Sequence, residues 1–302
     1  MAKNNVKSLT IVDKAVKGFL WGSLIIYCIS LLLTLGWVLF YSFNDSFSSS
    51  NGSLKIVFYN YVDAIVLFFT PKGRKSGYGL LDMLFYSLLY AGGTSFVTVS
   101  LYTMMGYVMA KYKFFGREAL YAIGIFVMVT PIIGNTASMV QVREFFGIRD
   151  NMFLLILTSN SCAFSGLNFL LIHAACKRVP WDYAESAFID GAGHVQVFLK
   201  IMLPMIMPSC AVVFVLMFLS VWNDYETFMV WLRFYPSLSL GLFNLYNRLQ
   251  AVQNDPDVVT AMRMGTPTIM AAYVIAMIPT IALYLASQRL ILDKFQVGGL
   301  KG

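Results

Sequence analysis

The sequence contains few charged residues. Only 12% of its 302 residues are charged, whereas 58% are hydrophobic and the mean hydropathy is +0.69. Soluble domains carry about a quarter charged residues, so this chain has too few ionised groups to cover a surface that faces water on all sides. The composition therefore excludes an ordinary soluble domain and indicates a membrane protein with several spans.

Two kinds of motif are also missing. The four cysteines lie within or at the end of apolar runs and form no C-x-x-C pair, so we expect buried thiols and no metal site. No G-x-x-x-x-G-K-[ST] phosphate loop occurs, so the chain has no evident means of holding ATP. We therefore expect neither an enzyme nor a bound cofactor. The excess of 22 basic over 15 acidic residues is interpreted as a topology signal and not as nucleic-acid binding.

Six apolar runs are long enough to cross a bilayer as helices, which requires about 20 residues. They are residues 19–43, 81–110, 119–142, 152–176, 205–231 and 267–290. Lipid offers backbone amides no other partner, so we predict an all-α membrane protein with six transmembrane helices. A shorter run, 57–70, contains Asn60 and Asp63 and suits an interfacial or re-entrant helix.

The basic residues set the expected orientation. Lys111, Lys113 and Arg117 lie in the short connection between the second and third runs, which favours a cytoplasmic position for that connection. Both termini are then cytoplasmic. The first run is too long for a signal-peptide core, so it should remain as an anchor. We divide the chain into an N-terminal anchor helix with an extracytoplasmic loop, residues 1–80, and a core, residues 81–302.

The least apolar long stretch, residues 182–204, lies between the fourth and fifth runs and is therefore expected in the cytoplasm. Asp182 followed by Glu185 predicts an N-cap with its capping-box partner, and Gly191 predicts the end of that helix. A second short helix over 195–202 should lead to Pro204, at the first turn of the fifth span.

The predicted helix has a face of small residues with one aromatic side chain. Ala184, Ala187 and Phe188 fall at i, i+3 and i+4, and small residues let another backbone approach closely. The alternative is an ordinary helix-turn-helix on the membrane surface. We interpret the face as a docking element.

The spacing of this stretch resembles a known signature. Glu185-Ser186-Ala187, three residues, Gly191, nine residues, then Ile201-x-Leu203-Pro204 is similar to the E-A-A-x3-G-x9-I-x-L-P motif of permease subunits of binding-protein-dependent ABC importers. Ser186 is the one departure, at a position where the family usually has alanine. Further agreement, most closely with the shorter permease of the maltose-type carbohydrate pair, comes from Val179-Pro180, Ile189-Asp190-Gly191-Ala192, Trp222-Asn223-Asp224 and Gly298-Gly299-Leu300-Lys301-Gly302.

The resemblance implies a role for the 182–204 stretch as a coupling helix seated on a cytoplasmic ATPase. Glu185 would be the polar anchor, Gly191 the turn, and the C-terminal tail would also reach toward the ATPases. The residues that it assigns to ATPase coupling are Asp182, Ala184, Glu185, Ser186, Ala187, Phe188, Asp190, Gly191, Leu203 and Pro204.

The resemblance also implies partners. Such a permease forms half of a pore, so it would pair with a second, different permease. Two ATP-binding cassette ATPases would hold ATP and magnesium beneath the pair, and an extracytoplasmic solute-binding protein would deliver a carbohydrate. The chain would be a multi-pass protein of a prokaryotic plasma membrane, surrounded by lipid, and would bind no nucleic acid. Residues 81–302 would be the permease core.

Polar residues within spans are candidates for a substrate pathway because they are costly in lipid. Amides and hydroxyls would suit a neutral sugar, and interhelical packing is the alternative for each position. The candidates are Asn135 and Ser138, expected on one face, Asn160 and Asn168, expected on another, and Asn223 with Asp224 near the outer surface.

Other functions fit less well. An ion-coupled carrier would require buried acidic residues near the middle of the membrane, but the acids lie in loops and at span ends. An assembly protein would not account for the spacing from Glu185 to Pro204. Ser165 and His173 resemble an intramembrane protease pair, but no G-x-S-G motif accompanies them. Within importers, a solute such as a glycerol phosphate ester remains an alternative to a sugar.

Overall fold

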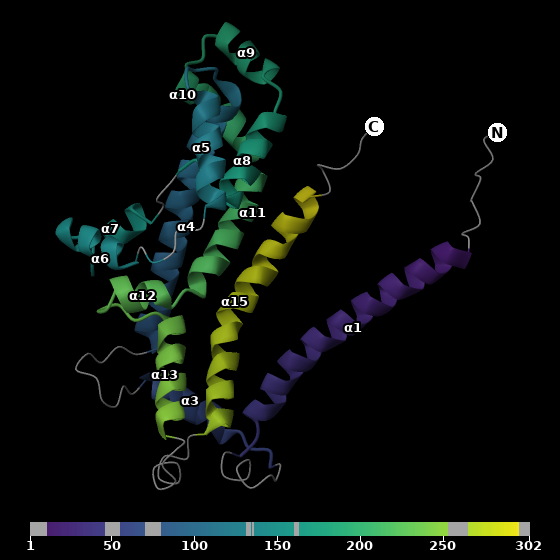
Figure 1. The fold of residues 1–302 in the computed structure, drawn as a ribbon, viewed down its shortest axis with the longest axis vertical. Helices are drawn as coiled ribbons and strands as arrows, with labels where there is room; N and C mark the ends of the chain where they lie inside the picture. The colour runs from purple at the N-terminus through teal and green to yellow at the C-terminus, as the bar shows by residue number, and fades with distance from the viewer. Residues whose placement is uncertain are drawn as a thin grey trace. The chain divides into compact units, whose positions relative to one another are not determined.

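The chain is all-helical in the part that the computed structural model describes, which comprises residues 11–45, 55–69, 80–130, 134, 136–159, 163–252 and 265–295. Within these ranges the only extended pairing is an isolated bridge between Asn44 and Ile56. Figure 1 shows the helices in chain order. The predicted all-α class is therefore confirmed.

Three helices of the described residues are long and apolar enough to cross a membrane. They are Val16–Ser42 within α1 (Ile11–Ser42), Leu81–Lys111 within α4 (Leu80–Lys111), and His194–Trp222, which ends with α11 (Leu203–Trp222). A shorter apolar stretch, Thr266–Ala282, begins α15 (Thr266–Phe295). Helices of this length and composition suit lipid and not water, so the chain is a membrane protein.

The sequence indicated that the third and fourth apolar runs are single helices, but the structure divides each of them in two. The third is divided into α5 (Arg117–Val129) and α6 (Thr136–Phe145), and the fourth into α7 (Met152–Leu157) and α8 (Leu167–Arg178). Thr130 is extended, with ψ 115°, as expected of a residue before proline. Gly166 is the N-cap residue of α8, and its φ of 95° and ψ of 158° are accessible to glycine alone.

The fifth run is also interrupted. Helix α11 ends at Trp222, and a separate short helix, α12 (Glu226–Trp231), follows after a turn. The predicted helix over 205–231 was therefore too long at its C-terminal end.

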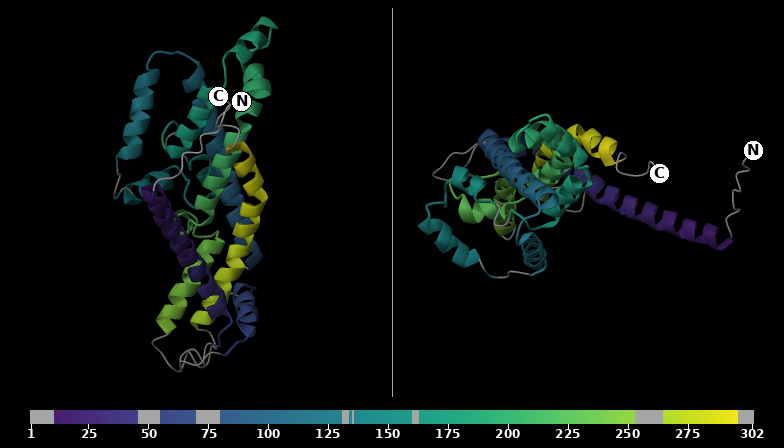
Figure 2. Two further views of the ribbon diagram at one scale, coloured as in Figure 1. Left: turned by 90° about the vertical axis from the view of Figure 1, so that its right-hand side faces the viewer. Right: turned by 90° about the horizontal axis from the view of Figure 1, so that it is seen from above.

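The larger of two compact units comprises Leu67–Leu245 with Ala276–Gly302. Its core is the packing of α4, α8 and α11 against one another. Helices α4 and α8 approach closely at Gly106, where a Cβ would be in van der Waals contact, 3.4 Å, with backbone atoms of His173. At the start of α13 (Leu238–Val252), the amide of Leu238 donates to the hydroxyl of Ser87, 2.9 Å away. Figure 2 shows α5 standing at the side of this bundle.

The smaller unit comprises Met1–Val66 with Tyr246–Ile275. Within it, the predicted short helix is confirmed as α3 (Tyr59–Phe69), with 11 residues. Asn60 is fully buried, and its amide nitrogen donates to the carbonyl oxygens of Ser42, at 2.9 Å, and Asn44, at 2.7 Å. Its amide oxygen lies 3.5 Å from the hydroxyl of Thr268. This asparagine joins three segments of the unit. The division of the chain at residue 80 stays a prediction.

Candidate functional site

The candidate site is the 182–204 hairpin, which stands at one end of the α4–α8–α11 bundle (Figure 1). It consists of α9 (Asp182–Ile189), a turn over 190–193, α10 (His194–Val197), a π-helical segment η1 (Phe198–Met202) and the first two residues of α11. The predicted helix-turn-helix is therefore present.

Helix α9 begins one residue earlier than the capping pattern predicted. Trp181 is the N-cap residue, and its carbonyl accepts the amides of Ala184, at 2.8 Å, and Glu185, at 3.1 Å. Asp182 is thus the first helical residue and caps nothing, so the predicted capping box was wrong. Its carbonyl instead accepts the hydroxyl of Ser186 at 2.9 Å. A carboxylate in the first turn still interacts favourably with the helix dipole.

The end of α9 matches the prediction. Gly191 has φ 82°, a left-handed conformation that costs other residues about 1 kcal/mol. Its amide donates to the carbonyl of Phe188 at 3.0 Å, and the amide of Ala192 donates to that of Ala187 at 2.9 Å. These two bonds form a Schellman motif, with Asp190 as the C-cap residue. Gly191 thus reverses the chain between α9 and α10.

The small-residue face of α9 points into the protein, which corrects the sequence interpretation. Ala184 is 0% exposed and Ala187 9% exposed, and both belong to the core cluster formed with α4, α8 and α11. Phe188 is half-buried against the same cluster. These side chains pack α9 against the other helices of the same chain, because small residues allow close approach. They are not available as a docking face for another subunit.

An aromatic cluster holds the hairpin against the end of α4. The ring of Tyr112 lies edge-on to Trp181, with centroids 5.8 Å apart, and its hydroxyl is 3.0 Å from Nδ1 of His194. Phe188 contacts both Trp181 and His194, at centroid distances of 6.1 Å and 4.9 Å. Nearby, Lys111 Nζ donates to the carbonyl of Val179. The histidine is exposed, and its contacts with Tyr112 and Phe188 help to fix the hairpin.

The outward face of the hairpin combines acidic and apolar side chains. Helix α9 exposes Asp182, Glu185 and Ser186, and Ile189 at its end is 85% exposed. The exposed apolar residues Tyr183, Val195 and Leu199 extend this outward face. Sequence reasoning missed these apolar positions, although Ile189 lies one helical turn after Glu185 and so shares its face.

The second half of the hairpin runs into the membrane helix without a break. We expected a separate helix over 195–202, but α10, η1 and α11 are continuous. The amide of Leu203 donates to the carbonyl of Phe198, a step of five residues. The next residue, Pro204, has no amide hydrogen to donate, so the wider turn falls where the regular hydrogen-bond ladder cannot continue. Leu203 is half-buried against the core cluster, and Pro204 is exposed.

The chain matches, over residues 102–297, the family described as binding-protein-dependent transport system inner membrane component. It belongs to this family. The matched region contains the whole hairpin and covers more than half of the chain. The chain is therefore a permease, a transport subunit and not an enzyme.

Several curated relatives of the permease carry transport names. It is 27% identical over 216 residues to the inner membrane ABC transporter permease protein YcjP of Escherichia coli, which covers 72% of this chain and 73% of YcjP. It is 27% identical over 237 residues to the galactooligosaccharides transport system permease protein GanQ of Bacillus subtilis, at 72% and 79% coverage. The osmoprotective compounds uptake permease protein GgtD of Synechocystis sp. is 28% identical over 159 residues, so the match spans about half of each chain.

Two solved structures share the fold. One is a bacterial ABC transporter involved in the import of the acidic polysaccharide alginate, with TM-score 0.73 and 20% identity, covering 94% of the permease and 99% of that chain. The other is a bacterial alginate ABC transporter in complex with its alginate pentasaccharide-bound periplasmic protein, with TM-score 0.61 and 17% identity, covering 92% and 95%.

Two of the predicted pathway residues of the permease, Asn135 and Asn160, lie outside the described residues, so the two faces expected of them stay predictions. Ser138 is exposed on α6. Asn168 lies on α8. The amide nitrogen of Asn168 lies 2.8 Å from Sδ of Met217, a contact between α8 and α11.

Asn223 and Asp224 are engaged at helix ends. The amide nitrogen of Asn223 donates to the carbonyl of Leu219 at 2.8 Å, at the end of α11. The carboxylate of Asp224 accepts the amide of Thr227 at 3.0 Å and its hydroxyl at 2.5 Å, and so orients the start of α12. Both side chains serve the turn between the two helices, and a pathway role for them stays a prediction.

Helix α4 contains buried polar residues that sequence reasoning did not select. Thr94, Ser95 and Thr98 are all at most 5% exposed, and Thr103 Oγ1 lies 3.3 Å from Sγ of Cys210 on α11. Among the described residues the hydroxyl of Ser95 has no hydrogen-bond partner. Their signal in the sequence was a run of hydroxyl residues within an apolar helix, which also fits simple packing.

Ser165 has a structural contact and not a catalytic one. Its hydroxyl donates to the carbonyl of Gly124 at 2.8 Å and is buried. Gly124 lies so close to the segment before α8 that a Cβ there would be 2.2 Å from the carbonyl oxygen of Phe164. This contact fixes α5 beside α8.

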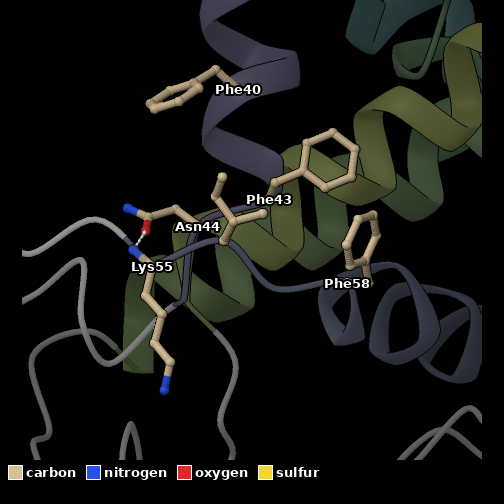
Figure 3. Close-up of a pocket in the computed structure, with 6 residues that line it drawn as sticks. Phe40, Phe43, Asn44, Lys55 and Phe58 are labelled. Atoms are coloured by element: carbon tan, nitrogen blue, oxygen red, sulfur yellow. Dashed lines mark hydrogen bonds between the residues drawn. The ribbon is translucent and has the colours of Figure 1, made fainter.

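The smaller unit has a separate cavity of about 210 Å³ at the end of α1 (Figure 3). Its walls are Phe40, Phe43, Ile56 and Phe58. The amide oxygen of Asn44 accepts the backbone amide of Lys55 at 3.0 Å, so this side chain is already engaged. The cavity therefore suits an apolar group better than a neutral sugar, which needs several hydrogen-bond partners.

Proposed function

We propose that the chain is the permease subunit of an ATP-driven importer for a sugar or oligosaccharide. Membership of the binding-protein-dependent family supports the importer. Relatives named for galactooligosaccharide, maltodextrin and trehalose transport support a carbohydrate as the solute. The relative GgtD, named for the uptake of osmoprotective compounds, keeps another solute as the alternative, of which a glycerol phosphate ester is one example.

The proposed topology has six crossings and cytoplasmic termini in a prokaryotic plasma membrane. Helix α5, with 13 residues, is about 20 Å long, which is shorter than a bilayer core of about 30 Å. The third crossing is then α5 together with α6, and the fourth is α7 together with α8. Interrupted helices are tolerated at membrane depth where the backbone is buried in protein or lines a water-filled cavity, as in a translocation pathway.

We propose that the 182–204 hairpin couples the permease to an ATPase through its outward face. Glu185 would supply the charged contact, and the exposed Tyr183, Ile189 and Val195 would supply apolar area at the interface. The buried Ala184 and Ala187 would transmit the force, since they pack α9 against the helices that enter the membrane. The observation that carries the proposal is this division of α9 into an anchored face and an exposed, acidic and apolar face.

The remaining partners follow from the same proposal. A second permease would complete the pore, two ATPases would hold ATP and magnesium, and an extracytoplasmic binding protein would deliver the solute. In the alginate structure the periplasmic protein is bound to an alginate pentasaccharide, which supports a carbohydrate-loaded partner.

Reconstitution tests the proposal. The chain is expressed with the permease, ATPase and binding-protein genes that adjoin its own, purified through a tag on this chain, and placed in liposomes. We expect an ATPase to copurify, and we expect ATP hydrolysis and sugar uptake to rise when the sugar-loaded binding protein is added. Uptake driven by a proton or sodium gradient in the absence of ATP would contradict the proposal.

A further inference from the structure

A cavity of about 390 Å³ lies at the hairpin end of the bundle, where α4, α5 and α8 meet. The end of α4 forms one wall, Arg117, Glu118 and Tyr121 of α5 a second, and His173 and Lys177 of α8 a third. We call it the basic pocket. Its size is within the range of small-ligand sites, which are about 300–1,000 Å³.

Two cations of the basic pocket are available to a ligand. The guanidinium of Arg117 is half-buried, and its one ion-pair contact among the described residues is a long one, 3.9 Å, to Glu118. That carboxylate is 92% exposed and is the one acid in the lining, so the pair contributes little. Lys177 is exposed and forms no ion pair within the described part of the chain.

The inner wall of the pocket is rigid. The ring of His173 lies between Tyr121, with centroids 5.2 Å apart, and Phe169, at 5.9 Å. The close approach of α4 and α8 at Gly106 fixes the same histidine from the other side. A pocket with a fixed wall and two cations is preorganised for an anion.

The surroundings of the pocket are those of a membrane surface. Lys113 and Arg178 are exposed beside it, and Phe115, in the turn before α5, is fully exposed. Further along α5, the apolar side chains of Ile123 and Phe126 are exposed. Aromatic and basic residues at the end of an apolar helix are typical of the boundary between headgroups and acyl chains.

We propose that the basic pocket binds the headgroup of an anionic phospholipid of the cytoplasmic leaflet. The phosphodiester would lie between Arg117 and Lys177, and the acyl chains would follow the apolar face of α5. Basic pockets between helices on the cytoplasmic side are known to hold anionic lipids, and each nearby cation contributes about fivefold to binding. Free phosphate offers the same chemistry, but it would leave the adjoining apolar face of α5 unused.

The lipid would also act on coupling. Helix α8 continues through Lys177 and Arg178 toward the hairpin, so a headgroup bound to Lys177 would fix the segment that enters α9. This part rests on the proposed coupling role of the hairpin, whereas lipid binding itself rests only on the pocket and on the proposed orientation.

Native mass spectrometry of the purified chain, with its copurified subunits, tests the site. The protein is taken from nanodiscs of phosphatidylcholine, with or without phosphatidylglycerol, and the bound phosphatidylglycerol is counted. We expect Arg117→Gln and Lys177→Gln each to weaken binding about fivefold, and the double variant about 25-fold. Lys113→Gln removes an equal charge from the same surface outside the pocket and should weaken binding clearly less than either pocket variant.

The comparison of these variants, and competition with inorganic phosphate, decide the proposal. If Arg117→Gln does not fold, Lys177→Gln against Lys113→Gln decides the result. Equal losses in the pocket variants and in Lys113→Gln would overturn the proposal, because the binding would then follow surface charge alone. Displacement of the lipid by millimolar inorganic phosphate would also overturn it, in favour of a free anion. Normal lipid binding with no ATP-driven uptake would reject the proposed function and leave the pocket intact.

Discussion

The hydroxyl of Tyr112, directly after the last residue of α4, lies 3.0 Å from Nδ1 of His194, the first residue of α10. This bond joins a membrane helix to the far side of the 182–204 hairpin, 82 residues later in the chain. Together with the ring contacts of Trp181 and Phe188, it makes the hairpin and the end of α4 one mechanical element. Force applied to the hairpin should therefore reach α4 as well as α11.

Removing this bond should loosen the hairpin. Tyr112→Phe keeps the ring contacts and loses about 1 kcal/mol of hydrogen bonding. We expect amide hydrogen exchange in α9 and α10 to become about fivefold faster, and uptake per ATP hydrolysed to fall. Tyr27→Phe, on the exposed α1, is the control. Unchanged exchange in the hairpin of Tyr112→Phe would contradict the mechanical role.

Reversing the charge of Glu185 should disrupt coupling. Glu185 is exposed at the centre of α9, and Glu185→Lys would place a cation where the proposed interface requires an anion. We expect the ATPase to dissociate more readily and uptake to be lost, with the helical fold unchanged. Retention of the ATPase during purification and sugar uptake measure the two effects.

Gln196→Lys is the control for that substitution, since Gln196 is also exposed, on α10, but lies outside the acidic face of α9. Normal uptake by Glu185→Lys, or equal losses in both variants, would remove Glu185 from the interface.

The turn of the hairpin depends on a single glycine. Gly191 has φ 82°, and a Cβ added there would meet no atom within 4 Å, so we expect the main cost of Gly191→Val to be backbone strain of about 1–3 kcal/mol. We expect a displaced α9 and reduced coupling. Gly193→Val introduces the same side chain two residues later at φ −77°, also without a clash, and should be tolerated. Comparable uptake in the two variants would show that the reversal at Gly191 is dispensable.

Helix α5 should be displaced by one added methyl group. In Gly124→Ala the Cβ would lie 2.2 Å from the carbonyl oxygen of Phe164, which is backbone and cannot rotate away. We expect a loss of several kcal/mol in stability, seen as a lower thermal unfolding temperature in detergent. Gly92→Ala, in α4 with nothing within 4 Å, should be neutral or stabilising. Equal unfolding temperatures for the two variants would show that α5 can move away from Phe164 without a loss of stability.

Hydrophobic length predicted the helices that are continuous and failed where they are interrupted. A continuous span requires about 20 apolar residues, and the runs at α1 and α4, which meet this requirement, are both single helices. The break after Val129 has a visible signal in the sequence, because Pro131 follows two residues later and has no amide hydrogen to donate. The break before α8 depends on the conformation of Gly166 and on its packing, and neither can be read from apolar length.

The hairpin was predictable in position and turn but not in orientation. Gly191 signals its own conformation, because few other residues adopt a positive φ at low cost. The side of α9 that faces the protein was not encoded locally. Ala184 and Ala187 permit close approach to any partner, and only the tertiary position of α9 over the bundle makes that partner the same chain. The basic pocket likewise required α5 and α8 to meet.

The π-helical segment between α10 and α11 holds one residue more than a regular helix needs. Each residue of an α-helix turns the chain by about 100°, so this extra residue sets the rotational phase between the hairpin and the membrane part of α11. Deletion of Leu199 alone would turn Ile189 and its neighbours away from their present direction, although no other residue of the hairpin would be replaced.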